Sequence, residues 1–147
     1  MFLPLFLGGL TVVLSMGIQI AAVVLMIRYV ISMITDRHRH TNSFSFDALV
    51  LISVLLLLFV GHLAQIAIWA MLFMQVGEFG SYQAAFYHSA VNFTSLGYGD
   101  IVMSESWRLL GALEAANGVL MFGLSAGTIF AVMARLFDQH KESTGLK

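Results

Sequence analysis

Residues 94–100 read TSLGYGD and are a short polar stretch between long apolar runs. Glycine adopts left-handed backbone conformations at little steric cost, so a run that alternates glycine with larger residues can point successive carbonyl groups the same way. Rings of such carbonyl oxygens can replace the hydration shell of a cation. One chain cannot form a ring, so this chemistry requires several copies around a common axis.

The composition places these residues in a membrane protein. The chain has 147 residues, of which 59% are hydrophobic and 10% charged, against roughly 45–50% and about 25% in soluble proteins. The net charge of −1 gives no electrostatic case for nucleic acid as a partner. The absence of cysteine excludes disulfides and thiolate metal sites. No cluster of catalytic residue types is present, so we expect no enzyme activity.

Three apolar runs predict three transmembrane helices. Residues 1–27 and 48–77 contain no formally charged side chain, and residues 109–134 contain only Glu114. Each run exceeds the roughly 20 residues that a spanning helix needs. The weaker segment 82–94 is too short to cross a bilayer and predicts a re-entrant helix. The expected fold is therefore an all-α membrane protein with three transmembrane helices and a re-entrant pore helix.

The basic residues predict the orientation in the lipid bilayer. Six of the seven Lys and Arg residues gather in two clusters, one between the first and second runs (Arg28, Arg37, Arg39) and one after the third (Arg135, Lys141, Lys147), and only Arg108 lies elsewhere. The positive-inside rule places both clusters in the cytoplasm. We therefore expect a multi-pass plasma-membrane protein whose N-terminus and residues 78–106 lie outside and whose C-terminus is cytoplasmic.

Residues 94–100 resemble the TTVGYGD signature of tetrameric potassium channels. The resemblance extends over residues 48–135 and includes an outer helix, the pore helix AFYHSAVNFT, the filter and an inner helix, as in bacterial two-span and inward-rectifier channels. It implies a homotetramer with K+ as the permeant ion and no organic cofactor.

The expected domain organisation follows from that resemblance. It comprises an extra N-terminal helix (1–34), a basic loop or interfacial helix (35–46), the pore domain (47–135) and a short cytoplasmic tail (136–147). Within the pore domain we expect the outer helix at 47–76, the pore helix at 82–94, the filter at 95–99 and the inner helix at 106–135.

The resemblance assigns five residues to the selectivity filter: Ser95, Leu96, Gly97, Tyr98 and Gly99. The carbonyl oxygens of the first four would form stacked K+ sites, the fifth would lie at the outer mouth, and the hydroxyl of Ser95 would complete the innermost site. Serine and leucine stand where the family has threonine and valine. The implied function is passive, selective K+ conduction. A non-selective monovalent cation channel and a non-conducting membrane subunit remain alternatives.

Four residues are expected to support the filter: Thr94, Asp100, Tyr87 and Val91. Many bacterial two-span and inward-rectifier channels have a glutamate where this chain has Val91. Tyr87 stands where the family has a tryptophan. It either donates a hydrogen bond to Asp100 or packs against Tyr98.

The inner helix contains the residues expected to form the cavity and gate: Glu114, Gly118, Phe122, Ala126 and Phe130. Gly118 is interpreted as a hinge, with close helix packing as the alternative reason for a glycine there. Phe122, Ala126, Ile129 or Phe130, and Met133 recur at helical spacing and could line the pore.

Glu114 and the other small or polar residues of the spans have structural interpretations. Glu114 is either neutral and hydrogen-bonded to Asn92 or Asn117, or charged and attractive to cations in the cavity. Gly123 and Gly127 fit a small-xxx-small helix contact, and His62 and Gln65 are expected to hydrogen-bond to a neighbouring helix.

His88 and the first span also have structural interpretations. His88 is expected to pack. The first span lacks the regularly spaced arginines of a voltage sensor and is expected to pack outside the outer helix of its own or a neighbouring subunit.

Overall fold

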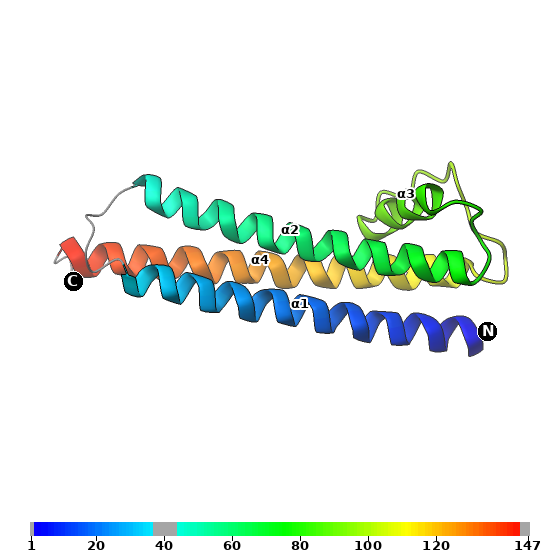
Figure 1. Ribbon diagram of the computed structural model, residues 1–147, viewed down its shortest axis with the longest axis horizontal. Coiled ribbons are helices and arrows are strands. Elements are labelled where there is room, and N and C mark those ends of the chain that lie inside the picture. The colour runs from blue at the N-terminus through cyan, green and yellow to red at the C-terminus, as the bar shows by residue number, and fades with distance from the viewer. Residues whose placement is uncertain (1, 37–43, 145–147) are drawn as a thin grey trace.

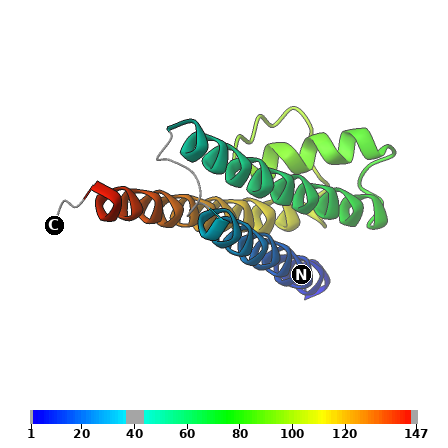
Figure 2. The ribbon, with the colours of Figure 1, turned by 60° about the vertical axis from the view of Figure 1, so that its left-hand side comes forward.

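The computed structural model describes residues 2–36 and 44–144, and within them it contains helices and no strand. The helices are α1 (Phe2–Asp36), α2 (Phe44–Gln75), α3 (Tyr82–Phe93) and α4 (Arg108–Thr144). The three long helices lie side by side, and the short α3 lies at one end of the bundle (Figure 1). Helix α3 contacts α2 and α4, and α1 packs on the opposite side of these two helices (Figure 2).

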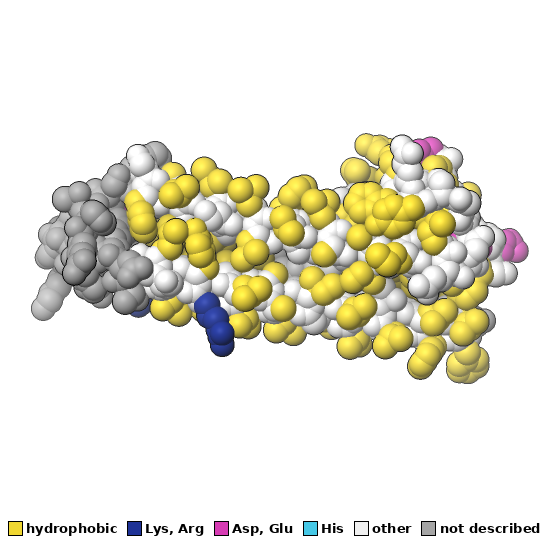
Figure 3. All heavy atoms as spheres, viewed as in Figure 1, with side chains coloured by type: hydrophobic (Ala, Val, Ile, Leu, Met, Phe, Trp, Pro, Cys, Tyr) yellow, Lys and Arg dark blue, Asp and Glu magenta, His cyan; other side chains and the backbone are white. Residues whose placement is uncertain are grey.

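Each long helix contains a segment long and apolar enough to cross a membrane: Phe2–Met33, Ser45–Gln75 and Arg108–Asp138. Apolar side chains cover these helices along their length on the face shown in Figure 3, as a lipid environment requires. On the same face, acidic side chains lie at the α3 end and a basic side chain lies toward the other end. The prediction of an all-α membrane protein with three spanning helices is confirmed.

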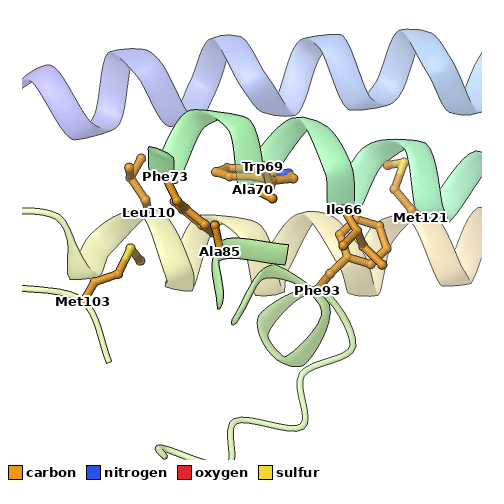
Figure 4. Close-up of a cluster of buried hydrophobic side chains, with 9 residues drawn as sticks. All are labelled: Ile66, Trp69, Ala70, Phe73, Ala85, Phe93, Met103, Leu110 and Met121. Atoms are coloured by element: carbon orange, nitrogen blue, oxygen red, sulfur yellow. The ribbon is translucent and has the colours of Figure 1, made fainter. Parts of the chain in front are cut away.

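A buried apolar cluster fixes α3 against the two helices that flank it in sequence. Helix α2 contributes four residues, α3 two and α4 two, and one comes from the loop before α4 (Figure 4); they are Ile66, Trp69, Ala70, Phe73, Ala85, Phe93, Leu110, Met121 and Met103. Trp69, Phe73 and Phe93 have no exposed surface. Burial of such large side chains contributes most of the apolar contact energy of a cluster, so the position of α3 is well determined.

Two helix ends differ from the sequence-based boundaries. Helix α4 continues through Thr144, so most of the segment expected to be a tail is helical. The reason is that no glycine or proline occurs between Arg135 and Thr144, and most residue types there tolerate a helix. The expected loop or interfacial helix at 35–46 lies mostly outside the described residues, because α1 ends at Asp36 and α2 begins at Phe44.

Helix α1 packs against α2 of its own chain, one of the two partners expected from the sequence, and also against α4, which the sequence did not reveal. A buried polar network joins the three helices. Gln19 donates to the hydroxyl of Ser125 at 2.9 Å and accepts from the amide of Gln65 at 2.8 Å. His62 Nε2 lies 3.0 Å from the same hydroxyl. The prediction that His62 and Gln65 bond to a neighbouring helix is confirmed, and polar pairs of this kind hold helices together in membranes.

Replacing Gln19 with leucine is expected to loosen α1 from the rest of the bundle. The change removes two buried interhelical hydrogen bonds, and each such bond contributes on the order of 1 kcal/mol within a membrane. The midpoint of thermal unfolding in detergent should therefore fall. Gln75→Leu is the control, because Gln75 is exposed at the end of α2. Equal midpoints for the two variants would contradict the importance of the network.

Candidate functional site

Helix α3 directly precedes the TSLGYGD stretch in the chain. It begins at Ser81, whose hydroxyl accepts a hydrogen bond from the backbone N–H of Ala84 and so caps the first turn. It ends at Phe93, and both the backbone N–H and the hydroxyl of Thr94 bond to the carbonyl of Ala90. Helix α3 has 12 residues, too few to cross a bilayer, so the stretch that follows it lies within the length of the long helices.

The backbone of residues 95–99 alternates in handedness. Ser95, Gly97 and Gly99 have φ values of 59°, 57° and 72°, whereas Leu96 and Tyr98 are not in the positive-φ region. Glycine adopts positive φ readily, but serine does so at a cost. Alternation of this kind turns successive peptide planes so that neighbouring carbonyl groups can face one side of the strand.

The peptide N–H groups at the start of this stretch are turned back toward α3. The N–H of Ser95 bonds to the carbonyl of Asn92 at 2.8 Å, and the N–H groups of Leu96 and Gly97 bond to the carbonyl of Val91 at 3.0 and 3.4 Å. In the described part of the chain, no group donates a hydrogen bond to the carbonyl oxygens of residues 95–99. A row of exposed, unpaired carbonyl oxygens is an arrangement that can coordinate a cation.

Among the described residues, no group of three or more histidine, aspartate or glutamate side chains is arranged to hold a metal ion.

One side of the stretch is held by Tyr87 and Asp100. The Tyr87 hydroxyl donates a hydrogen bond of 2.8 Å to Asp100 Oδ2, which resolves the open alternative in favour of the hydrogen bond. This bond raises the pKa of the Tyr87 hydroxyl, so the phenol remains the donor at neutral pH. Val91 is buried behind the stretch and provides the carbonyl that two of its N–H groups share. The segment is thus tied to α3 both before and after its glycines.

Replacing Tyr87 with phenylalanine is expected to loosen the end of the stretch at Asp100. The change removes one hydroxyl and keeps the ring, so the carboxylate loses its only hydrogen-bond donor among the described side chains. We expect the backbone amides of residues 98–101 to exchange faster with solvent than in the wild type, as measured by hydrogen–deuterium exchange of the full chain in detergent. Tyr82→Phe on the same helix is the matched control, and an equal response of the two variants would contradict this role.

The segment after the glycines is also held by His88, a residue expected to pack. Its side chain lies against the rings of Phe73 and Phe79, with centroid distances of 5.6 and 4.9 Å. It also uses both ring nitrogens. Nδ1 lies 3.0 Å from the carbonyl oxygen of Ile101, and Nε2 lies 2.8 Å from Nδ2 of Asn92. The segment after the glycines is therefore hydrogen-bonded to two neighbouring residues of α3, Tyr87 and His88.

The loop that leads to α4 is fixed by Glu78, which the sequence analysis did not single out. Its carboxylate accepts hydrogen bonds from the backbone N–H and the hydroxyl of Ser104, at 2.7 and 2.6 Å. These bonds tie the loop between α3 and α4 to the segment that follows α2.

Glu114 lies in the protein interior, between α4 and α3. It has no exposed surface, and the hydroxyl of Ser89 lies within hydrogen-bond distance of both its carboxyl group and the carbonyl oxygen of Ile66. The amide of Asn117 is buried without a partner in the described chain. Of the two interpretations, the hydrogen-bonded structural role fits this placement, with Ser89 as a partner that the sequence did not reveal.

Gly118 lies against the end of α3. A Cβ atom built on Gly118 would be 1.8 Å from the carbonyl oxygen of Phe93. Helix α4 also runs unbroken from Arg108 to Thr144. Close packing therefore accounts for this glycine, in place of the hinge that the sequence favoured.

The other expected cavity residues lie on an exposed face of α4. Phe122, Ala126, Phe130 and Met133 are exposed and follow one another at helical spacing, while Ile129 is partly buried. The Phe122 ring also contacts Phe93 of α3 and His62 of α2, with centroid distances of 5.6 and 4.8 Å. This face of α4 therefore adjoins the end of α3.

Gly123 and Gly127 have no atom within 4 Å of a built Cβ, so they make no close helix contact within the chain. Both line an apolar groove between α1 and α4. Their role in a small-xxx-small contact remains a prediction about neighbouring chains.

Comparison with known proteins shows a family match over most of the chain. A family model described as ion channel matches residues 49–135, which is more than half of the sequence. The match includes α2 from its second turn, α3, the TSLGYGD stretch and α4 up to Arg135. Helix α1 lies outside it. No solved structure matches the chain.

Proposed function

The chain belongs to the ion channel family, and from that premise we propose that it conducts K+ passively and selectively through a pore on the axis of a homotetramer. The carbonyl oxygens of Ser95, Leu96, Gly97 and Tyr98 line the narrow part of this pore and bind dehydrated K+. The Ser95 hydroxyl completes the innermost site, and the Gly99 carbonyl lies at the outer mouth.

The observation that carries this proposal is the backbone of residues 95–99. Its φ values alternate in sign, its first N–H groups bond to α3, and its carbonyl oxygens have no donor among the described residues. Carbonyl dipoles that converge on one axis replace the water around an ion and favour the ion that their number and spacing suit. The side chains of Leu96 and Tyr98 are exposed in the single chain, and neighbouring copies cover them in the tetramer.

The surroundings support conduction of a cation. The carbonyl end of a helix has a partial negative charge, and α3 ends at Phe93, immediately before the filter. The exposed face of α4 with Phe122, Ala126 and Phe130 lines the cavity below it. The protein lies in the plasma membrane with the α3 end and the N-terminus outside and the C-terminus in the cytoplasm, in keeping with the positive-inside rule.

The test is ion flux from the purified full chain in liposomes. Parallel samples contain a K+ gradient or an equal Na+ gradient, and barium is added as a blocker. Flux of K+ alone, blocked by barium, is the expected result. Equal K+ and Na+ fluxes would refute the selectivity, and no flux of either ion from assembled tetramers would favour a non-conducting subunit.

A second candidate is a non-selective cation channel of the same architecture. It is motivated by Ser95, which lacks the methyl group that restrains a threonine rotamer, and by Leu96 in place of valine. The double variant Ser95→Thr, Leu96→Val distinguishes the two. If both the wild type and the variant select K+ over Na+, the first proposal is supported. If only the variant selects K+ over Na+, the second is supported.

A further inference from the structure

His88 is the buried titratable residue closest in sequence to the filter for which the proposed conduction gives no role. It lies on α3 with 6% of its surface exposed. Its imidazole joins the carbonyl of Ile101, two residues beyond the last filter glycine, to the amide of Asn92, one helical turn along α3. It therefore connects the outer end of the filter with the helix that supports the inner end.

The partners of His88 fix its protonation state. A carbonyl oxygen can only accept, so Nδ1 must carry the proton that is donated to Ile101. In a neutral imidazole Nε2 is then an acceptor, and it receives an N–H from the Asn92 amide at 2.8 Å. Two hydrogen bonds thus join Ile101, His88 and Asn92, and this pair of bonds is complete when His88 is neutral.

We propose that His88 is a positioning residue that holds the segment after the filter against the pore helix only while its imidazole is neutral, so that acid on the outer face reduces K+ conduction. The inference rests on the proposed function. A protonated His88 has a second N–H on Nε2, which faces the N–H group of Asn92. Either the Asn92 amide must then turn, or His88 must move and release Ile101.

The groups around His88 determine the direction of its response to pH. The charges that act on it are Asp100, beyond the filter, and Glu78, in the segment after α2, whereas Glu114 of α4 is bonded to Ser89. Burial lowers the pKa of His88, and the bond to Ile101 and the charges of Asp100 and Glu78 oppose that effect without cancelling it. The neutral form therefore predominates at neutral pH, and the contact is lost as the pH falls through the lowered pKa.

The first test reads the protonation of His88 directly and requires no ion flux. Long-range proton–nitrogen spectra are recorded on the full chain in lipid nanodiscs, labelled with ¹⁵N-histidine. The His88 signals are those missing from His88→Asn and from His88→Gln. We expect the Nδ1–H tautomer and a titration midpoint below the ordinary value of about 6.5. The Nε2–H tautomer, or a midpoint at or above that value, would overturn the proposal.

The second test measures K+ current in planar bilayers while each face is acidified separately. Between about pH 7.5 and about pH 5, where histidine changes its charge, we expect wild-type current to fall several-fold from the outer face. We expect the K+ current of His88→Asn to be independent of the pH on the outer face, because the asparagine amide can still donate a hydrogen bond to Ile101 but cannot take up a proton. A triple variant that replaces His38, His40 and His140 with glutamine is the control and should retain the wild-type profile.

The outcomes separate this inference from the proposed function. If His88→Asn responds to acid as the wild type does, Asp100 or Glu78 is the sensor and the role of His88 is refuted. A wild-type current that does not depend on pH refutes it as well. Absence of K+ current at every pH refutes conduction instead, and the tautomer and midpoint of His88 then decide the positioning role independently.

Discussion

For the proposed tetrameric K+ channel, replacing Gly97 with alanine is expected to abolish K+ conduction while the tetramer remains assembled. Gly97 has φ = 57°, and a built Cβ meets no atom within 4 Å, so the effect is conformational and not a steric clash with a neighbour. Left-handed φ costs a residue with a Cβ roughly 1–2 kcal/mol. Four copies contribute to one ring, so the conducting conformation loses about 4–8 kcal/mol in total.

The strain is relieved if φ returns to negative values, and that rotation turns a carbonyl away from the ion. We expect K+ flux from liposomes to fall by more than about 100-fold, since each 1.4 kcal/mol changes an equilibrium about tenfold. Size-exclusion chromatography should show an unchanged tetramer. A variant that still conducts K+ selectively would contradict the assignment of this backbone as the filter.

Gly77→Ala provides a matched control for the backbone strain. Gly77 also has positive φ, 78°, and a built Cβ there also meets no atom within 4 Å. It lies between α2 and α3, away from the filter. The substitution should cost a comparable strain energy but leave K+ selectivity intact. Equal loss of conduction in both variants would show that general destabilisation, and not carbonyl orientation, explains the result at Gly97.

The sequence was sufficient to predict those structural features that depend on residues within one segment of the chain. Apolar runs longer than a bilayer requires predicted three spanning helices, because the lipid demands apolar side chains along the full length of each span. The short segment before the glycines predicted α3. The bond between Tyr87 and Asp100 was one of two alternatives that the sequence left open, and the structure contains it. Polar residues within an apolar span, such as His62 and Gln65, were correctly expected to have interhelical partners.

The sequence was insufficient where a partner is chosen by the packing of distant elements. Ser89 became the partner of Glu114 only because α3 lies against α4 at one particular register. His88 resembles a packing residue in the sequence, yet its ring nitrogens reach Ile101 and Asn92. The contact between α1 and α4 depends on Gln19 and Ser125, which are 106 positions apart. No periodicity within a single segment contains this information.

Gly118→Ala is expected to be the most destabilising single-methyl change in α4. The added Cβ would lie 1.8 Å from the carbonyl oxygen of Phe93 and 2.8 Å from its carbonyl carbon. Both atoms are backbone, so no side-chain rotation can relieve the clash, and α3 or α4 must shift. Overpacking of this kind costs typically about 1–3 kcal/mol and occasionally more. The thermal midpoint of the tetramer should fall, and K+ flux should fall with it, because Phe93 is two residues before the filter.

The same variant separates the packing role of Gly118 from that of a hinge. Alanine stiffens a helix and stabilises it by up to about 1 kcal/mol relative to glycine, so loss of a hinge alone would leave stability unchanged or raised and would alter only opening. Loss of packing lowers stability as well as flux. Gly17→Ala in α1 is the control, because a built Cβ there meets no atom within 4 Å. A Gly118→Ala tetramer as stable as this control would restore the hinge interpretation, since the approach of α4 to Phe93 could then not be what requires a glycine.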